Sequence, residues 1–308
     1  MDGVSYAPPS MPPFRTGQTY ALTVSTGRYN NTRDLMIQVP ARKGTKAPPI
    51  VEPKSLVHMM LPGNVGLLKI VYFPGAFGVR FAMKLDEAIK DLKDKGCDRL
   101  IIDLRGNIGG SLGFARLASY MSPGSIPIGR SLTPRRLRTG YNLGALPRVP
   151  MPGSRAALLF TLGRFAFRDK SVVLLTQGLG KQPFHSKIAL LVNECTNSAA
   201  EMVASFAAEN RLATVIGNKT GGHVLGAVNL KVGGGYWLRL PIFGWYTSQG
   251  ESLEGKGVIP DLVVDVDPVL LNAGIDQQME KAIEVIHDIA ARVASAATSF
   301  PKESDRHT

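Results

Sequence analysis

One serine stands where an apolar run gives way to a helical pattern, and that position could make it a nucleophile. The run at 187–192 is rich in leucine and β-branched residues, which is typical of a buried parallel strand. From residue 199 to 210, apolar residues recur at three- and four-residue spacing and predict a helix with one buried face. Thr196, Asn197 or Ser198 would begin that helix. Ser198 could therefore be a nucleophile or only a helix cap.

Two turns of this chain could stabilise an oxyanion. Backbone N–H groups at a helix start favour negative charge, so a tetrahedral oxyanion beside Ser198 would be stabilised there. The segment Arg105–Gly110 is rich in glycine, which lets backbone N–H groups approach a ligand closely. Its spacing matches neither a P-loop nor a dinucleotide-binding fingerprint, which disfavours phosphate binding.

Strands and helices alternate around these turns. The pattern predicts a strand at 66–73, a helix at 81–95 and a strand at 99–104, which form a strand, helix, strand unit of the α/β class. Further elements are expected in the rest of the chain: a helix at 112–121, a strand at 214–217, a strand pair at 224–232 and 236–241, and a helix at 277–293.

The chain divides into three predicted regions. Residues 1–50 form a β-rich segment, with short strands at 20–25 and 34–39, and run into a proline-rich linker at 41–53. The catalytic domain is expected over 51–292. It includes a weakly patterned stretch at 122–186, which we interpret as an elaborated loop or lid with apolar segments at 156–162 and 171–176. Residues 293–308 are expected to be a tail.

Composition excludes several classes of protein. With 308 residues and 44% hydrophobic content, the chain can bury a full core. It has no apolar run of eighteen residues and no secretory leader pattern, so we expect no transmembrane segment, while compartment and oligomeric state stay open. Cys97 and Cys195 are too few for a disulfide framework, and no ligand cluster accompanies them, so we expect no structural metal and no cofactor.

The formal net charge of +12 would suit an acidic partner. Much of the charge lies between Arg130 and Arg168, but the aromatic residues there form no stacking platform and no nucleic-acid-binding motif is present. A solvated basic surface is the favoured interpretation, and nucleic-acid binding is not expected.

Four motifs, in this order, resemble those of the tail-specific, or C-terminal processing, serine peptidase family: Asp103–Gly110 (DLRGNIGG), Thr196–Glu201 (TNSAAE), Val215–Gly222 (VIGNKTGG) and Gly255–Asp261 (GKGVIPD). The resemblance covers roughly residues 63–286 and implies a crotonase-like α/β core of stacked ββα units. In many members a PDZ domain precedes this core, and the strands near residues 20 and 35 resemble the last portion of one.

The resemblance also implies roles for particular residues. Ser198 matches the nucleophile, and the oxyanion hole would use the N–H of Ala199 and one from the turn at Gly109 and Gly110. The position of the usual catalytic lysine is occupied by His223. A neutral histidine is a competent general base near neutral pH, so His223 is the candidate base.

Other possible bases and nucleophiles fit less well. A strand of about seven residues at about 3.3 Å each separates its ends by roughly 20 Å, which disfavours His185. Lys69 occupies the position of the base histidine in the tricorn-like branch of the family and is expected to be a surface charge. Lys219 is expected to face solvent, and Cys195 to be a small buried residue. The remaining histidines lie in the linker, the last helix and the tail: His58, His287 and His307.

The sequence thus predicts a serine endopeptidase that hydrolyses peptide bonds of polypeptide substrates through an acyl-enzyme on Ser198. One alternative is a catalytically impaired relative that binds peptides or partner proteins through the same cleft. A third class, acyl-thioester chemistry of the crotonase type, shares the core but does not call for a serine at this helix start.

Overall fold

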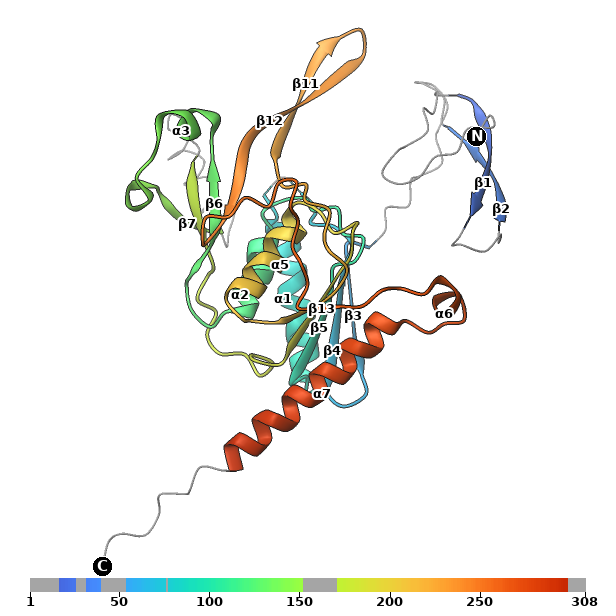
Figure 1. The fold of residues 1–308 in the computed structure, drawn as a ribbon, viewed down its shortest axis with the longest axis vertical. Helices are drawn as coiled ribbons and strands as arrows, with labels where there is room; N and C mark the ends of the chain where they lie inside the picture. The colour runs from blue at the N-terminus through green and yellow to red at the C-terminus, as the bar shows by residue number, and fades with distance from the viewer. Residues whose placement is uncertain (1–16, 26–31, 40–53, 76, 152–170, 299–308) are drawn as a thin grey trace, which may run out of the picture. The chain divides into compact units, whose positions relative to one another are not determined.

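The computed structural model describes residues 17–25, 32–39, 54–75, 77–151 and 171–298 (Figure 1). The chain separates into two units, one made of residues 1–53 and 266–277 and the other of residues 54–265 and 278–308. The predicted linker at 41–53 lies outside the described residues, as does the apolar segment at 156–162.

The first unit contains a strand pair and a short helix. Strands β1 (Thr19–Ser25) and β2 (Thr32–Gln38) are antiparallel, so the predicted strand pair is confirmed. Helix α6 (Pro268–Asn272) begins after Asp267, whose side chain accepts a hydrogen bond from the Val269 N–H (2.8 Å). Aspartate before a first-turn proline is a favourable helix start.

The second unit is built on a six-stranded sheet of order β13-β10-β9-β5-β4-β3. All neighbours are parallel except β3 and β4. The strands are β3 (Leu56–Leu61), β4 (Val65–Ile70), β5 (Arg99–Asp103), β9 (Ile188–Val192), β10 (Thr214–Gly217) and β13 (Leu262–Val263). The α/β class predicted from the alternating pattern is confirmed.

Side chains of this sheet alternate between two apolar clusters, as the period of two in a strand requires. In β5, Leu100 and Ile102 join the cluster that includes residues of α1 (Val79–Asp94), α2 (Phe114–Met121) and α5 (Ala199–Glu209). Ile101 joins a second cluster with Ala282 and Ile286 of α7 (Gln277–Thr298). Helices therefore cover both faces of the sheet, which explains why its central strands read as continuous apolar runs.

A second sheet has the order β11-β12-β6-β8-β7. Its strands are β6 (Pro127–Leu132), β7 (Arg148–Pro150), β8 (Val172–Leu175), β11 (Gly226–Gly233) and β12 (Tyr236–Thr247). The prediction of an elaborated loop at 122–186 is wrong for its described part, because three of these strands lie there. The segment also holds α3 (Pro134–Thr139) and the short 3₁₀ helix η1 (Leu143–Ala145).

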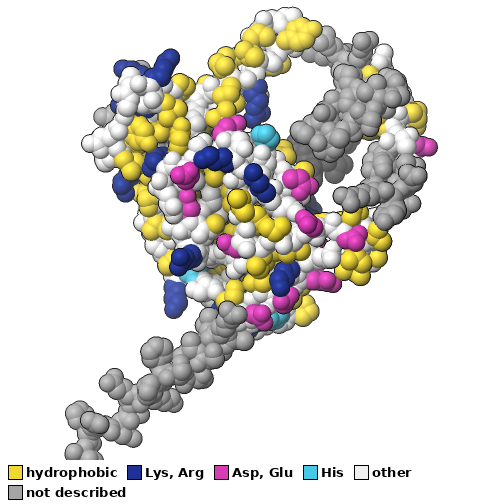
Figure 2. Space-filling model, viewed as in Figure 1, with side chains coloured by type: hydrophobic (Ala, Val, Ile, Leu, Met, Phe, Trp, Pro, Cys, Tyr) yellow, Lys and Arg dark blue, Asp and Glu magenta, His cyan; other side chains and the backbone are white. Residues whose placement is uncertain are grey.

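The β11–β12 hairpin has two chemically different faces. Val228 lies opposite Leu240 and Leu230 opposite Leu238, and these four side chains are exposed. The other face carries Asn229 opposite Arg239 and Lys231 opposite Trp237. The hairpin extends beyond the helices of its unit, and Figure 2 shows hydrophobic side chains on its surface.

Two elements differ from the predictions. The strand β3 was not expected, and His58 lies in it rather than in a linker, with its Nε2 3.0 Å from Asp91 Oδ2. The last helix continues to Thr298, five residues beyond its predicted end at 293. Among the described residues, no helix is both long and apolar enough to cross a membrane.

Candidate active site

Ser198 lies between strand β9 and helix α5, as the sequence predicts. Its backbone has φ 55° and ψ −120°, a combination that residues with a side chain rarely adopt and that costs free energy. In α/β-hydrolases, a comparably strained turn from strand to helix exposes a nucleophilic hydroxyl. Ser198 is also the N-cap residue of α5, so the predicted helix cap and the predicted nucleophile are the same residue.

Asn107 ties the glycine-rich turn after β5 to the turn that holds Ser198. The Asn197 N–H donates to the Asn107 carbonyl oxygen (2.8 Å). The fully buried Asn107 side chain in turn donates to the Ile70 carbonyl oxygen (2.9 Å). Since both contacts involve groups buried from water, they fix the two turns in a defined relative position.

Gly109 packs directly against the serine. A Cβ added at position 109 would lie 2.6 Å from the Ser198 Cβ and 2.9 Å from the Ala199 nitrogen. The φ of Gly109 is 93°, which also favours glycine. A side chain at position 109 would therefore push the two turns apart.

The two glycines of this turn use their backbone N–H groups differently. The Gly109 N–H donates to the Asn107 side-chain oxygen (2.8 Å). The β-bridge that joins the turn to Phe73 does not use the Gly110 N–H, which has no acceptor among the described residues. The Ala199 N–H, at the first position of α5, also has no acceptor within the described part of the chain. Gly110 and Ala199 therefore keep N–H groups that could bind an oxyanion.

Glu201 connects the serine to the turn that carries His223. Its side chain is completely buried. One carboxylate oxygen accepts the Ser198 N–H (3.0 Å) and the His223 N–H (2.9 Å), and the other accepts the Thr220 hydroxyl (2.6 Å) and the Gly222 N–H (2.7 Å). Four donors on one carboxylate satisfy a buried charge that would otherwise be very costly.

The fourth motif supports the same turn from the other side. The Val258 N–H donates to the Thr220 hydroxyl oxygen (2.7 Å), and the Thr220 N–H donates to the Val258 carbonyl oxygen (3.1 Å). The Gly255 N–H donates to the Gly222 carbonyl oxygen (2.8 Å). Residues 255–258 thus hold the chain that leads to His223.

Four of the five predicted site residues line one cavity of about 450 Å³: Ser198, His223, Gly109 and Gly110. His223 is exposed, and within the described residues its ring forms no hydrogen bond with Ser198. Ala199, the fifth residue, lines a neighbouring cavity that also includes Ser198 and Gly110. The structure therefore brings together segments that are up to 114 positions apart in the sequence, from Gly109 to His223 (223 − 109).

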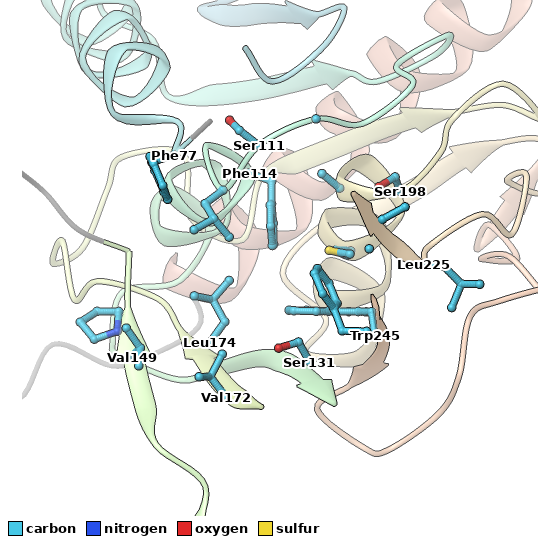
Figure 3. Close-up of a pocket in the computed structure, with 18 of the residues that line it drawn as sticks. Phe77, Ser111, Phe114, Ser131, Val149, Val172, Leu174, Ser198, Leu225 and Trp245 are labelled. Carbon is cyan, nitrogen blue, oxygen red and sulfur yellow. The ribbon is translucent and has the colours of Figure 1, made fainter. Parts of the chain in front are cut away.

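The neighbouring cavity has a volume of about 460 Å³ and is mostly apolar (Figure 3). Aromatic side chains contribute much of its lining, among them Phe114, Phe243 and Trp245. In Figure 3, Ser198 lies on one side of the cavity and Val149 and Val172 lie on the other. An apolar cavity with few polar groups is typical of a site for a small molecule or a side chain.

Sequence reasoning missed several residues of this region. Glu254 lines the first cavity, and its carboxylate accepts hydrogen bonds from the Val224 and Leu225 N–H groups (2.7 and 3.1 Å). Arg239 lines both cavities. The only sequence signal for Glu254 was its place directly before the fourth motif, while Arg239 lies in an ordinary strand pattern.

The charged residues of the first and fourth motifs have structural contacts. Asp103 forms a two-oxygen ion pair with Arg105, whose Nε and Nη2 each lie 2.9 Å from a carboxylate oxygen. Asp261 accepts the Val215 N–H of β10 (2.8 Å). These contacts close the turns on which the candidate site is built.

The alternative bases and nucleophiles lie elsewhere or are differently exposed. Lys69 and Lys219 are exposed, as predicted. His185 lies near neither cavity, and its ring contacts the Tyr120 carbonyl oxygen (2.9 Å) and the Gln182 N–H (3.2 Å). His287 is exposed on α7, and His307 lies outside the described residues.

The prediction that Cys195 is buried is wrong. Cys195 is exposed because β9 ends at Val192 and the following turn reaches the surface. In this turn the Cys195 N–H donates to the Asn193 side chain (3.2 Å), and its carbonyl oxygen accepts from the Asn197 side chain (3.0 Å). Cys97 is the buried cysteine, and burial raises the pKa of its thiol.

Known proteins resemble the chain in sequence. The carboxy-terminal-processing protease of Bartonella bacilliformis is 28% identical over 213 residues, which cover 68% of this chain and 41% of the relative. The carboxyl-terminal-processing protease of a Synechocystis species is 24% identical over 251 residues, which cover 80% of this chain and 49% of the relative. The chain thus spans less than half the length of these two curated relatives.

The fold resembles that of a solved photosystem II D1 C-terminal processing protease. The TM-score is 0.52 at 18% sequence identity, and the match covers 83% of this chain and 57% of the other. At this identity the match speaks for the fold. The model of peptidase family S41 matches residues 64–264, a stretch that includes all four motifs and both turns of the candidate site. The chain therefore belongs to peptidase family S41.

Proposed function

We propose that this chain is a serine endopeptidase that hydrolyses peptide bonds of polypeptide substrates. The observation that carries the proposal is the single cavity lined by Ser198, His223 and the glycine-rich turn. It combines a hydroxyl on a strained turn, a titratable side chain and the unused N–H group of Gly110, and the unused Ala199 N–H lies next to the serine. The names of the two curated relatives agree with this activity.

In the proposed reaction, the Ser198 Oγ attacks the carbonyl carbon of the scissile bond while His223 takes the hydroxyl proton. The carbonyl oxygen becomes an oxyanion and accepts hydrogen bonds from the Gly110 and Ala199 N–H groups. His223 then gives its proton to the leaving amine as the C–N bond breaks, which leaves an acyl-enzyme on Ser198. Water, activated by the neutral His223, attacks the ester and releases the second product.

The finer description of the fold belongs to the same proposal. We infer that the six-stranded sheet and its helices are a crotonase-like core of ββα units, with the peptidase domain over 51–292. The predicted tail at 293–308 begins too early, because α7 continues to Thr298. Strands β1 and β2 are proposed to be the end of a PDZ-like domain. Two adjacent antiparallel strands and the order of the motifs support these assignments.

The nucleophile is tested by comparing the wild type with Ser198→Ala on an unfolded protein substrate and on a fluorophosphonate probe. We expect the wild type to cleave the substrate and to be labelled, and Ser198→Ala to do neither. The matched control is Ser248→Ala, whose hydroxyl donates to Glu209 (2.7 Å) and which lines neither of the two cavities.

Equal cleavage and labelling by the wild type and Ser198→Ala would remove Ser198 from the mechanism. A wild type that neither cleaves nor reacts, but binds the unfolded substrate, would contradict the peptidase proposal and favour a non-catalytic binding module.

A further inference from the structure

We infer that Arg239 binds a carboxylate group of the polypeptide substrate, an assignment that rests on the proposed peptidase function. The guanidinium group would thereby select which polypeptides reach Ser198 and in which position. Two carboxylates of a polypeptide have the required chemistry: the C-terminal carboxylate and the side chain of an aspartate or glutamate.

The position of Arg239 supports this role. It lies in β12 opposite Asn229 of β11 and lines both cavities that contain Ser198. No other residue of the chain with a permanent positive charge is among those that line either cavity in the described part. A substrate that occupies either cavity therefore lies near this one guanidinium group.

The electrostatic surroundings leave the charge of Arg239 available. The apolar cavity that contains Ala199 is lined by no acidic residue of the described chain. The cavity that contains His223 is also lined by Glu254, but the Glu254 carboxylate already accepts hydrogen bonds from two backbone N–H groups. Within the described residues, Arg239 forms no ion pair, and its side chain is exposed. An unpaired guanidinium beside an apolar cavity attracts a carboxylate more strongly than one in open water.

The strand register extends the positive charge beyond Arg239. Ala227 and Lys231 lie two residues on either side of Asn229, so all three share one face of the hairpin with Arg239. Ala227 lines the apolar cavity, so this face of the hairpin is directed toward the site. Lys231 therefore adds a second positive charge on the same face, farther along the hairpin.

The apolar cavity and Arg239 together define the class of substrate. An apolar cavity of about 460 Å³ suits an apolar side chain, whereas a guanidinium fork suits a planar carboxylate in two-point contact. The substrate segment that fits best combines an apolar residue with a nearby carboxylate. Lysine in place of arginine would keep the charge but lose the two-point geometry.

The test measures peptide binding without cleavage, in the Ser198→Ala variant. Fluorescein-labelled apolar peptides are compared by fluorescence anisotropy in matched pairs: a free C-terminus against a C-terminal amide, and an internal glutamate against glutamine. We expect at least one carboxylate form to bind about 10- to 100-fold more tightly than its uncharged partner, the range for a charge-assisted hydrogen bond. The pair that shows the preference identifies the source of the carboxylate.

Adding Arg239→Gln should remove this preference, and adding Arg239→Lys should retain part of it. The control is Arg80→Gln, which changes an exposed arginine of α1 that lines neither cavity. Circular dichroism verifies that each variant is folded.

Equal binding of charged and uncharged peptides, no binding of any peptide, or a preference that persists in Arg239→Gln would each overturn the assignment. Failure of the peptidase proposal is detected separately, because cleavage is measured with the wild type and binding with Ser198→Ala.

Discussion

The backbone of Ser198 is strained, and this strained conformation is the one that presents its hydroxyl to the cavity. A φ of 55° with ψ −120° costs on the order of 1–3 kcal/mol for a residue with a side chain. The N–H groups of Asn197 and of Ser198 itself are held by Asn107 and Glu201, and these hydrogen bonds offset part of the cost. The strain is thus confined to Ser198, and the hydrogen bonds of the neighbouring backbone maintain it.

The base is the residue whose role most needs a direct measurement. We expect His223→Ala to lower kcat by about 10² to 10⁴, the usual loss when a general base is removed. The side chain is exposed, so its removal should leave the fold unchanged. Steady-state kinetics on a peptide substrate measures the effect, and Lys219→Ala, an exposed residue four positions earlier, serves as the control. Wild-type turnover in His223→Ala would exclude this histidine as the base.

The residue types and their order allowed much of the candidate site to be predicted. The strand-to-helix junction singled out Ser198 as a nucleophile or a helix cap, and the family resemblance added the role of nucleophile. The glycine turn was found because it follows a buried strand. Glu201, Glu254 and Arg239 were missed because their roles depend on contacts with distant segments. Glu201, for example, contacts residues 19 to 22 positions later in the chain.

At the level of elements, helix α5 and the turn at 220–223 are joined through one side chain. Glu201 lies in the first turn of α5 and accepts N–H groups from both the start of the helix and the turn. The position of His223 relative to Ser198 therefore depends on this carboxylate. Glu201 is a positioning residue, since its carboxylate acts on the site through the backbone N–H groups of Ser198 and His223.

We expect Glu201→Gln to lower the free energy of unfolding by about 1–3 kcal/mol, because an amide offers one acceptor oxygen where the carboxylate offered two and leaves buried donors unpaired. Urea unfolding measures this change, with Glu194→Gln, an exposed position in the preceding turn, as the control. We also expect kcat to fall more than KM changes. Unfolding midpoints equal to that of the wild type would contradict a positioning role.

The central strands of the main sheet and the β11–β12 pair of the second sheet were predicted, whereas β3, β6 and β7 were missed. Strands β5 and β9 are buried on both faces, so their sequences read as apolar runs with clear ends. Strand β6 pairs instead with β12, more than a hundred positions away, and is interrupted by glycine and arginine. Local periodicity therefore carried no signal for a strand whose pairing partner is distant.

For the whole molecule, the formal net charge of +12 is the dominant long-range property. Lys and Arg side chains gather around α3 on the face seen in Figure 2, where α3 contains Arg135, Arg136 and Arg138. A field of one sign raises the local concentration of oppositely charged partners. Acidic polypeptides should therefore reach this protein faster than neutral ones.

The net positive charge predicts that the rate of association with acidic substrates depends on ionic strength. The Debye length falls from about 30 Å at 0.01 M to about 8 Å at 0.15 M ionic strength. We expect kcat/KM for an acidic protein substrate to decrease severalfold over this range, while that for a neutral peptide stays nearly constant. Initial rates at a series of salt concentrations test it. Parallel salt curves for both substrates would show that the net charge plays no part in association.

The carboxylate of Glu201 also bears on how the protein is made. A ribosome releases the chain from its N-terminus, so Ser198 and Glu201 emerge before Thr220, Gly222 and His223, and these emerge before Val258, which holds Thr220. Until all of them have emerged, Glu201 lacks its buried donors and His223 lacks its support. The support of the candidate base therefore forms only after residue 258 has been synthesised, later than the turns that carry Gly109 and Ser198.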